Sequence, residues 1–207
     1  MGLYTNKGLY NKYKKNNKQR AAEDYYATPT VEVKNILNTL GYDFSNMLIL
    51  EPCIGGGHMM DGIVDYVQNQ NCRLIGTDIK DRGYSNDRVN LQYELDFLSD
   101  DYPIEKADVV IMNPPYETLE PFLIRALEIA EKYLIVLCRT QALEGKGRFE
   151  NVYAANPPTD VYQYIDRIQC WKNGIPNNEA SAQAYAWFVW DKTKEEKNTQ
   201  LHWLWRK

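Results

Sequence analysis

The sequence has no apolar run near the ~20 residues that a membrane-spanning helix needs, and its first 20 residues contain no apolar stretch typical of a signal peptide. We therefore expect a cytoplasmic protein with no membrane partner. It has only four cysteines and two histidines, and no CxxC pair. This pattern predicts free thiols in a reducing compartment and no metal site. The sequence indicates no oligomeric state.

Acidic residues are absent from residues 1–20, which hold six Lys or Arg. The whole chain has 24 Lys and Arg against 28 Asp and Glu, so residues 21–207 carry a formal charge of −10. A basic arm, residues 1–23, thus precedes an acidic body. The arm is either a segment that binds phosphates and stacks tyrosines on bases, or a solvated tail. The acidic body argues against a protein that coats nucleic acid, so we expect any nucleic-acid contact to be local.

The chain has 207 residues, of which 44% are hydrophobic and 25% charged, as expected for one globular domain with a substantial core. Neither an internal repeat nor a linker divides residues 24–190, which we assign to that domain. Residues 191–207 form a C-terminal tail that is polar and charged up to two large aromatic residues, Trp203 and Trp205. These two side chains either dock on the domain or contact a partner.

Apolar periodicity predicts an alternation of helices and strands. The first helix has Thr28 as N-cap and Pro29 as its first residue, and it ends at Gly41. The predicted strands are 47–50, 73–79, 107–112, 133–138, 161–168 and 183–190, with helical patterns at 60–67 and 119–130. No helix is evident between the last two strands, so they should pair antiparallel. We predict an α/β fold with a doubly wound, mainly parallel sheet, helices on both faces and an antiparallel final strand.

Ligands of such sheets bind at the carboxyl ends of the strands. The first strand leads into Glu51 and the turn Gly55-Gly56-Gly57, which is either a tight connection or a ligand loop. Asp78 follows the second strand, 22 residues after Gly56, where it either accepts hydrogen bonds from a ribose or caps a helix. Asp96-Phe97 is either an acid and an aromatic ring that bind a base through its exocyclic amine, or a surface turn with one core Phe. Together, the glycines and Asp78 favour a ligand that contains a nucleoside.

The strongest motif is Asn113-Pro114-Pro115-Tyr116, directly after a strand that reads as buried. An exocyclic amine on a ring is a poor nucleophile because its lone pair is delocalised. The Asn113 side-chain oxygen and the Pro114 carbonyl can accept both amine hydrogens and so free the lone pair. The prolines stiffen the loop, and Tyr116 offers a ring for stacking on a base.

In these features the sequence resembles the S-adenosylmethionine (SAM) dependent methyltransferases with a Rossmann-like class I sheet, above all the DNA adenine-N6 methyltransferases of gamma motif order. The resemblance covers residues 24–140. It implies SAM as cofactor, DNA rather than RNA as partner, and Asn113, Pro114, Pro115 and Tyr116 as the catalytic motif. The implied cofactor-binding residues are Tyr26, Thr28, Pro29, Glu51, Cys53, Gly55, Gly57, Asp78, Ile79, Asp96 and Phe97. The glycine turn departs from the family pattern, because His58-Met59 replace its usual Phe or Leu; we interpret His58 as a helix N-terminal residue.

We expect no large target-recognition domain of the kind that restriction-associated enzymes carry, and the compact layout is similar to that of small phage and prophage methyltransferases. Substrate contacts are therefore expected in the loops, from Lys146, Arg148, Phe149 and Trp171. For Arg148, a solvated surface charge is an equal alternative to a phosphate contact. Two alternatives to DNA methylation remain: the same chemistry on an RNA purine amine or a protein glutamine, and a SAM-fold subunit without catalysis.

Overall fold

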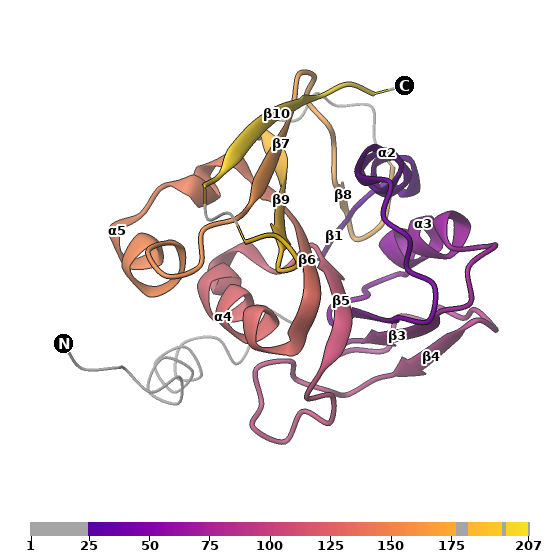
Figure 1. Cartoon of the computed structure of the whole chain (residues 1–207). Coiled ribbons are helices and arrows are strands. Elements are labelled where there is room, and N and C mark those ends of the chain that lie inside the picture. The colour runs from indigo at the N-terminus through magenta and orange to yellow at the C-terminus, as the bar shows by residue number, and fades with distance from the viewer. Residues whose placement is uncertain (1–24, 177–181, 196–197, 207) are drawn as a thin grey trace.

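The computed structural model describes residues 25–176, 182–195 and 198–206, so the predicted basic arm lies outside the described residues. An eight-stranded sheet forms the centre of the molecule (Figure 1). Its strands, in spatial order, are β10 (Gln200–Leu204), β7 (Asp160–Tyr164), β9 (Tyr185–Asp191), β6 (Ala130–Arg139), β5 (Ala107–Met112), β2 (Leu48–Glu51), β3 (Arg73–Thr77) and β4 (Val89–Gln92). All neighbouring pairs are parallel except those that involve β9.

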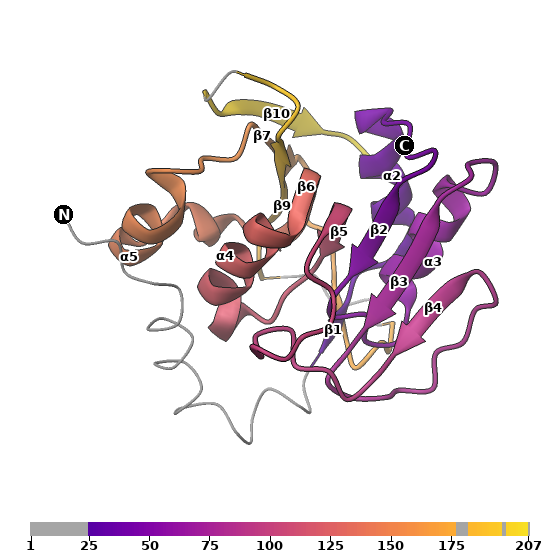
Figure 2. The ribbon, with the colours of Figure 1, turned by 60° about the horizontal axis from the view of Figure 1, so that its bottom comes forward.

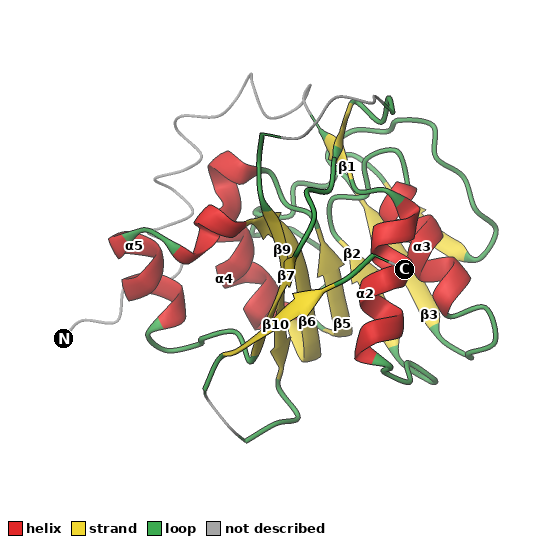
Figure 3. Ribbon diagram, turned by 90° about the horizontal axis from the view of Figure 1, so that it is seen from above, coloured by secondary structure: helices red, strands yellow, loops and turns green. Residues whose placement is uncertain are grey.

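Helices cover both faces of this sheet (Figure 3). Helices α2 (Thr30–Leu40) and α3 (His58–Tyr66) lie on one face. The other face carries α4 (Leu119–Ile129), with α5 (Lys146–Arg148) and η3 (Phe149–Tyr153) beyond it. Single turns, η1 (Tyr116–Thr118) and η2 (Thr140–Leu143), follow β5 and β6. This arrangement confirms the predicted doubly wound, mainly parallel sheet.

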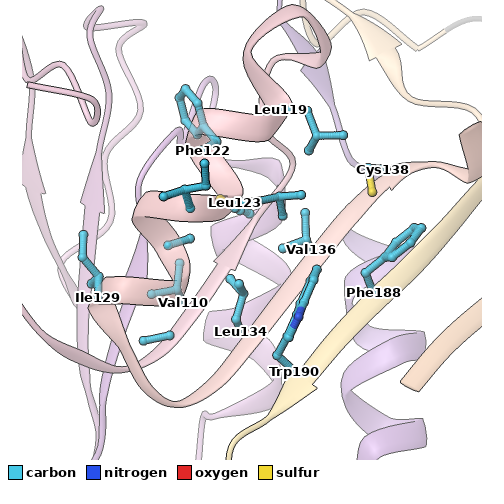
Figure 4. Close-up of a cluster of buried hydrophobic side chains, with 14 of the residues drawn as sticks. Val110, Leu119, Phe122, Leu123, Ile129, Leu134, Val136, Cys138, Phe188 and Trp190 are labelled. Carbon is cyan, nitrogen blue, oxygen red and sulfur yellow. The ribbon is translucent and has the colours of Figure 1, made fainter. Parts of the chain in front are cut away.

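The middle positions of the central strands are apolar because both faces of these strands are buried there. In β5, Val110 and Met112 pack under α4, whereas Val109 and Ile111 pack under α2 and α3. Figure 4 shows the first of these two cores, in which Leu123 of α4 lies over Val110 and Val136. All of these side chains are less than 1% exposed. The short apolar runs of the sequence therefore mark the middle of the sheet.

Helix α2 ends as predicted, but it begins one residue later than expected, at Thr30. Gly41 has a left-handed backbone, and its N–H bonds the Leu37 carbonyl, which closes the helix. Pro29 stays extended and stands at the N-cap position. The Thr28 hydroxyl does not cap the helix; it lies 3.1 Å from the Asn113 side-chain nitrogen. A tertiary contact thus replaces the local one that the sequence predicts.

The carboxyl-terminal part of the sheet extends the predicted pattern. Strands β7 and β9 pair antiparallel as expected, but β9 is followed by β10, which pairs parallel with β7. The residues that the sequence set apart as a C-terminal tail thus supply an edge strand. Beyond it, the Trp205 carbonyl accepts a hydrogen bond from Asn35, and Arg206 pairs with the buried Glu32 of α2.

A second, two-stranded sheet was not predicted. Strand β1 (Tyr26–Ala27) pairs antiparallel with β8 (Trp171–Lys172). Figure 2 shows β1 beside the carboxyl ends of β2 and β3. This ribbon brings the first described residues and the long connection after β7 to the same edge of the main sheet. Among the helices of the described chain, none has the length and apolarity to cross a membrane.

Candidate functional site

The carboxyl ends of β2, β3, β5 and β6 meet at one edge of the sheet and carry polar side chains there. Glu51 ends β2, Asp78 follows β3, Asn113 follows β5 and Arg139 ends β6. We call this the carboxyl edge. Of these four residues, only Arg139 was not singled out from the sequence. The rule that identified the other three also applies to Arg139.

The glycine turn is built on Asp78. The Gly55 N–H donates to Asp78 Oδ2 at 2.8 Å, and the Ile54 N–H donates to the Thr77 carbonyl at 3.0 Å. Gly55 has φ of +56°, and a Cβ atom there would lie 2.7 Å from the Tyr25 ring. Both the backbone angle and the close approach of Tyr25 require glycine at this position.

Asp78 has polar partners on both oxygens. Besides Gly55, it accepts hydrogen bonds from the Lys80 N–H at 2.9 Å and from Arg82 Nη1 at 3.0 Å. The Arg82 guanidinium also lies 4.6 Å from the centre of the Tyr25 ring. Ile79, next to Asp78, is 53% exposed and presents an apolar surface beside the carboxylate. The predicted ribose-binding acid is thus at the edge, and Arg82 and Tyr25, which the sequence did not indicate, lie against it.

Glu51 is buried and incompletely paired. Its side chain is 2% exposed, and Oε2 has no hydrogen-bond partner within the described chain. Burial, followed by the charges of Asp78 and Asp61, raises the pKa of Glu51 well above its usual value. Beside it, the Cys53 thiol donates to the Asn113 carbonyl at 3.5 Å. The edge therefore holds an acid that a cationic ligand would stabilise in its charged form.

The Asn113 side chain has a defined orientation. Its Nδ2 atom donates to the Tyr26 carbonyl at 2.9 Å and lies 3.1 Å from the Thr28 hydroxyl oxygen. A backbone carbonyl only accepts, so the atom that faces it must be the amide nitrogen. Oδ1 consequently points away from this segment, and no described residue donates to it or to the Pro114 carbonyl. The Pro115 carbonyl, in contrast, accepts the Thr118 N–H.

Tyr116 is less accessible than expected for a stacking platform. Its hydroxyl is buried without a hydrogen-bond partner in the described chain, and its ring centre lies 6.3 Å from those of Tyr26 and Tyr185. The Arg139 guanidinium covers the ring at 4.2 Å. Burial, with Cys170 and Tyr185 nearby, raises the pKa of Tyr116, so its hydroxyl is neutral. A base that stacks on Tyr116 would meet Arg139.

The structure favours the alternative interpretation of Asp96-Phe97. Phe97 is 2% exposed and packs edge-on against Tyr102 and beside Phe122, in the core under α4. Asp96 is exposed, and its Oδ1 accepts the Leu98 N–H, as in a turn. The pair is thus a surface turn above a core Phe, and Phe97 offers no open wall to a ligand. Asp96 remains accessible beyond β4.

The four candidate substrate residues fall into two groups. Trp171 of β8 lies at the carboxyl edge, with its ring centre 5.7 Å from that of His58, the first residue of α3. Lys146 and Phe149 are exposed in the segment after β6, which packs against α4. In the same segment, Arg148 Nη1 donates to the Ala142 and Glu144 carbonyls, so Arg148 holds its own loop together.

Four of the seven buried polar atoms that lack a partner within the described chain lie at this edge: Glu51 Oε2, His58 Nδ1, Tyr116 Oη and Arg139 Nε. The other three are Glu32 Oε2, Arg125 Nε and Arg148 Nε. Since buried polar groups are normally paired, such a concentration is typical of a ligand site. SAM suits the cofactor side of the edge: its cationic ammonium and sulfonium groups match Glu51, and its adenosine matches Asp78 and Ile79. No group of three or more metal-ligating side chains occurs among the residues that the structure describes.

No model of a protein family and no curated protein matches this chain. Solved structures are similar in fold. The methyltransferase subunit of a type I restriction-modification system from Streptococcus thermophilus has a TM-score of 0.66 and 14% sequence identity, over 97% of this chain and 52% of the subunit. This chain therefore spans about half the length of that subunit.

Two further solved structures are similar to this chain over more than nine tenths of its length. A Listeria monocytogenes protein assigned to the class I SAM-dependent methyltransferases has a TM-score of 0.64 and 15% identity, over 96% of this chain and 72% of its own. A Pyrococcus horikoshii protein assigned as an RNA methyltransferase has a TM-score of 0.58 and 16% identity, over 92% and 99%. The chain has the fold of the class I SAM-dependent methyltransferases.

Proposed function

We propose that this protein is a SAM-dependent methyltransferase that methylates the exocyclic N6 amine of adenine in DNA. The observation that carries the proposal is the orientation of Asn113. Tyr26 and Thr28 hold its amide nitrogen, so that Oδ1 and the Pro114 carbonyl are left as two acceptors at the carboxyl edge. An amine with two hydrogens fits such a pair of acceptors.

These acceptors would do the chemical work of the site. They bind both amine hydrogens, draw the nitrogen toward tetrahedral geometry and free its lone pair for attack. Bound SAM supplies an electrophilic methyl group. Because the lone pair is made available by hydrogen bonding, attack on the methyl group needs no side-chain base with a tuned pKa. The methylated nitrogen would then release its extra proton to water. Pro114 and Pro115 keep the loop rigid and lack N–H donors that would compete for the acceptors.

The cofactor side of the edge is assigned to Glu51, Gly55, Asp78 and Ile79, with Tyr26, Thr28 and Pro29 flanking the methionine end of SAM. Cys53, Gly57 and Asp96 complete the proposed set. Phe97 does not form a wall of the proposed adenine pocket, because the core surrounds it. The target adenine would have to leave its stack to reach Asn113, as in other enzymes that modify bases.

The neighbours by fold support nucleic acid as the substrate class. They include a subunit of a type I restriction-modification system and a protein assigned as an RNA methyltransferase. An RNA purine amine is therefore the alternative substrate, and it would use the same acceptors. We favour DNA because the order of the motifs along the chain resembles that of the DNA adenine-N6 methyltransferases.

Product analysis tests the proposal. Purified protein is incubated with isotope-labelled SAM and with unmethylated DNA, structured RNA or cell extract, and labelled products are identified by mass spectrometry. We expect label in N6-methyldeoxyadenosine. Label in an RNA base or a glutamine would replace the substrate and keep the chemistry, and absence of label from all three would reject the enzyme assignment for the isolated chain.

A matched pair of variants tests the role of Asn113. Asn113→Ala should lower the rate of transfer by about 100- to 1,000-fold, the usual effect of removing one preorganised polar contact at a reacting group. SAM affinity, measured by calorimetry, should stay unchanged. Asn156→Ala is the control because Asn156 precedes Pro157-Pro158 in an exposed loop away from the edge. Equal loss of transfer and SAM binding in Asn113→Ala would contradict the assignment.

A further inference from the structure

Arg139 is a half-buried cation with no counter-charge among the residues that the structure describes. Its Nε atom is buried and has no hydrogen-bond partner, and no carboxylate of the described chain pairs with it. The Tyr116 ring at 4.2 Å offsets part of the unfavourable desolvation, but a ring face does not accept the in-plane N–H donors of a guanidinium. This arrangement indicates an anionic partner that the described residues do not supply.

The place of Arg139 in the sheet identifies the side from which that partner comes. Strand β6 lies next to β5 and is separated by β5 from β2 and β3. The glycine turn and Asp78, which we assign to the cofactor, follow β2 and β3. Arg139 therefore lies on the other side of Asn113, where the substrate must enter if the proposed function is right.

Nearby basic side chains differ from Arg139. Arg82 pairs with Asp78, and Arg148 donates to two backbone carbonyls of its own loop. Lys146 is exposed and lies 3.8 Å from Glu150. Of these side chains, Arg139 is the one that faces the Asn113 motif with its donors unused.

On the basis of the proposed function, we propose that Arg139 binds a phosphodiester group of the nucleic acid next to the target nucleotide, while the target base enters beside Tyr116. A guanidinium group matches phosphate oxygens with two parallel N–H donors. An acidic body, with a charge of −10 outside residues 1–20, needs such local cations to hold a polyanion. Arg139 is thus a substrate-binding residue at the boundary between the base pocket and the backbone of the nucleic acid.

The experiment compares the wild type with Arg139→Met, Arg139→Lys and Arg73→Met. Met keeps much of the side-chain length without the charge, and Lys keeps the charge without the planar fork. Arg73 is exposed at the amino end of β3, so its replacement removes the same charge from the opposite edge of the sheet. For each protein, KM for unmethylated DNA and for structured RNA is measured across a series of KCl concentrations. SAM affinity is measured by calorimetry, and folding is checked by thermal melting.

We expect Arg139→Met to raise KM for the nucleic acid about tenfold and to reduce the slope of log KM against log [KCl] by about one ion, with SAM affinity unchanged. Arg139→Lys should have the same salt slope as the wild type, and a KM between those of the wild type and Arg139→Met. Arg73→Met should behave like the wild type.

Three results would overturn the inference. An unchanged salt slope would mean that Arg139 contacts the base edge or only supports Tyr116. A loss of SAM affinity in Arg139→Met would place Arg139 in the cofactor site. An equal rise of KM in Arg73→Met would mean that the effect comes from the total charge of the protein and not from a phosphate contact of Arg139. If the wild type methylates nucleic acid and only the Arg139 effects are missing, the proposed function survives. If the wild type methylates neither nucleic acid, both proposals fail.

Discussion

The two edges of the main sheet differ in whether their buried polar groups have hydrogen-bond partners. At the amino edge, Asp160 accepts hydrogen bonds from Lys194 and His202, both at 2.8 Å, and Asp191 accepts from Tyr42 and Thr193. At the carboxyl edge, in contrast, Glu51, Tyr116 and Arg139 each keep a buried atom without a partner in the described chain.

This difference separates structural from functional polar groups. A buried group that serves only the fold is stabilised by partners within the chain, because an unpaired one is costly. A group that serves a ligand is left incomplete until the ligand arrives. Changes at the amino edge should therefore alter stability and spare binding, whereas changes at the carboxyl edge should weaken binding.

The largest contrast is expected between two glycine variants. Gly55→Ala should weaken SAM binding by about 30-fold or more, because Cβ would meet Tyr25 at 2.7 Å and distort the turn that the cofactor approaches. Gly41→Ala imposes a similar left-handed strain at φ +64°, but it has open space around Cβ and lies at the end of α2. Gly41→Ala should lose roughly 1 kcal/mol of stability, and Gly55→Ala should lose more because of the added contact with Tyr25. SAM calorimetry and thermal melting measure the two effects, and equal SAM affinity in the two variants would contradict the assigned turn.

The amino edge should respond in the opposite way. Asp160→Asn removes the negative charge that contacts both Lys194 and His202. It should lower the free energy of unfolding by about 1–2 kcal/mol, and the effect is no larger because both partners are partly exposed. SAM affinity and methyl transfer should not change. Asp166→Asn is the control, because Asp166 is exposed just after β7. Loss of SAM binding in Asp160→Asn would show that the two edges are not independent.

The same carboxylate predicts a pH dependence. Burial raises the pKa of Asp160, but the hydrogen bonds from Lys194 and His202 outweigh it, so the pKa lies below its usual value. A lowered pKa in the folded state contributes stability above the unfolded value of ~3.9, and this contribution is lost as the pH falls through the folded pKa. The stability difference between the wild type and Asp160→Asn should therefore shrink on going from about pH 5 toward pH 2. Urea unfolding at several pH values measures it, and a constant difference would contradict the pairing.

The smallest expected effect sharpens the description of the carboxyl edge itself. Arg82 donates a hydrogen bond to Asp78, the carboxylate to which we assign the ribose of SAM. Arg82→Met removes this competing donor and should therefore tighten SAM binding by roughly 2- to 5-fold. Lys80→Met removes a neighbouring exposed charge and should have no effect. Weaker binding by Arg82→Met would instead make Arg82 part of the cofactor site.

Much of the fold was readable because its signals are local. Doubly buried strands such as β5 and the helices between them leave continuous or periodic apolar runs. The strand-end rule also located Glu51, Asp78 and Asn113. The same rule covers Arg139, but nothing around Arg139 in the sequence resembles a motif, and it was not singled out.

Other features depend on contacts between distant segments, which composition and periodicity do not report. The Thr28 hydroxyl faces Asn113 and not its own helix. Strand β10 carries exposed Leu201 and Trp203 and reads as a tail, although its backbone pairs with β7. Phe97 satisfies a motif by identity, but the core under α4 decides where its ring lies.

The β1–β8 ribbon also bears on how the protein is made. It joins Tyr26 to Lys172, and the Tyr26 carbonyl orients Asn113 from 87 positions earlier in the chain. A chain emerging from the ribosome holds the glycine turn and the Asn113 motif long before β8 exists to pair with β1. Since contacts of high sequence separation form late, methyl transfer should be the last property that the nascent chain acquires.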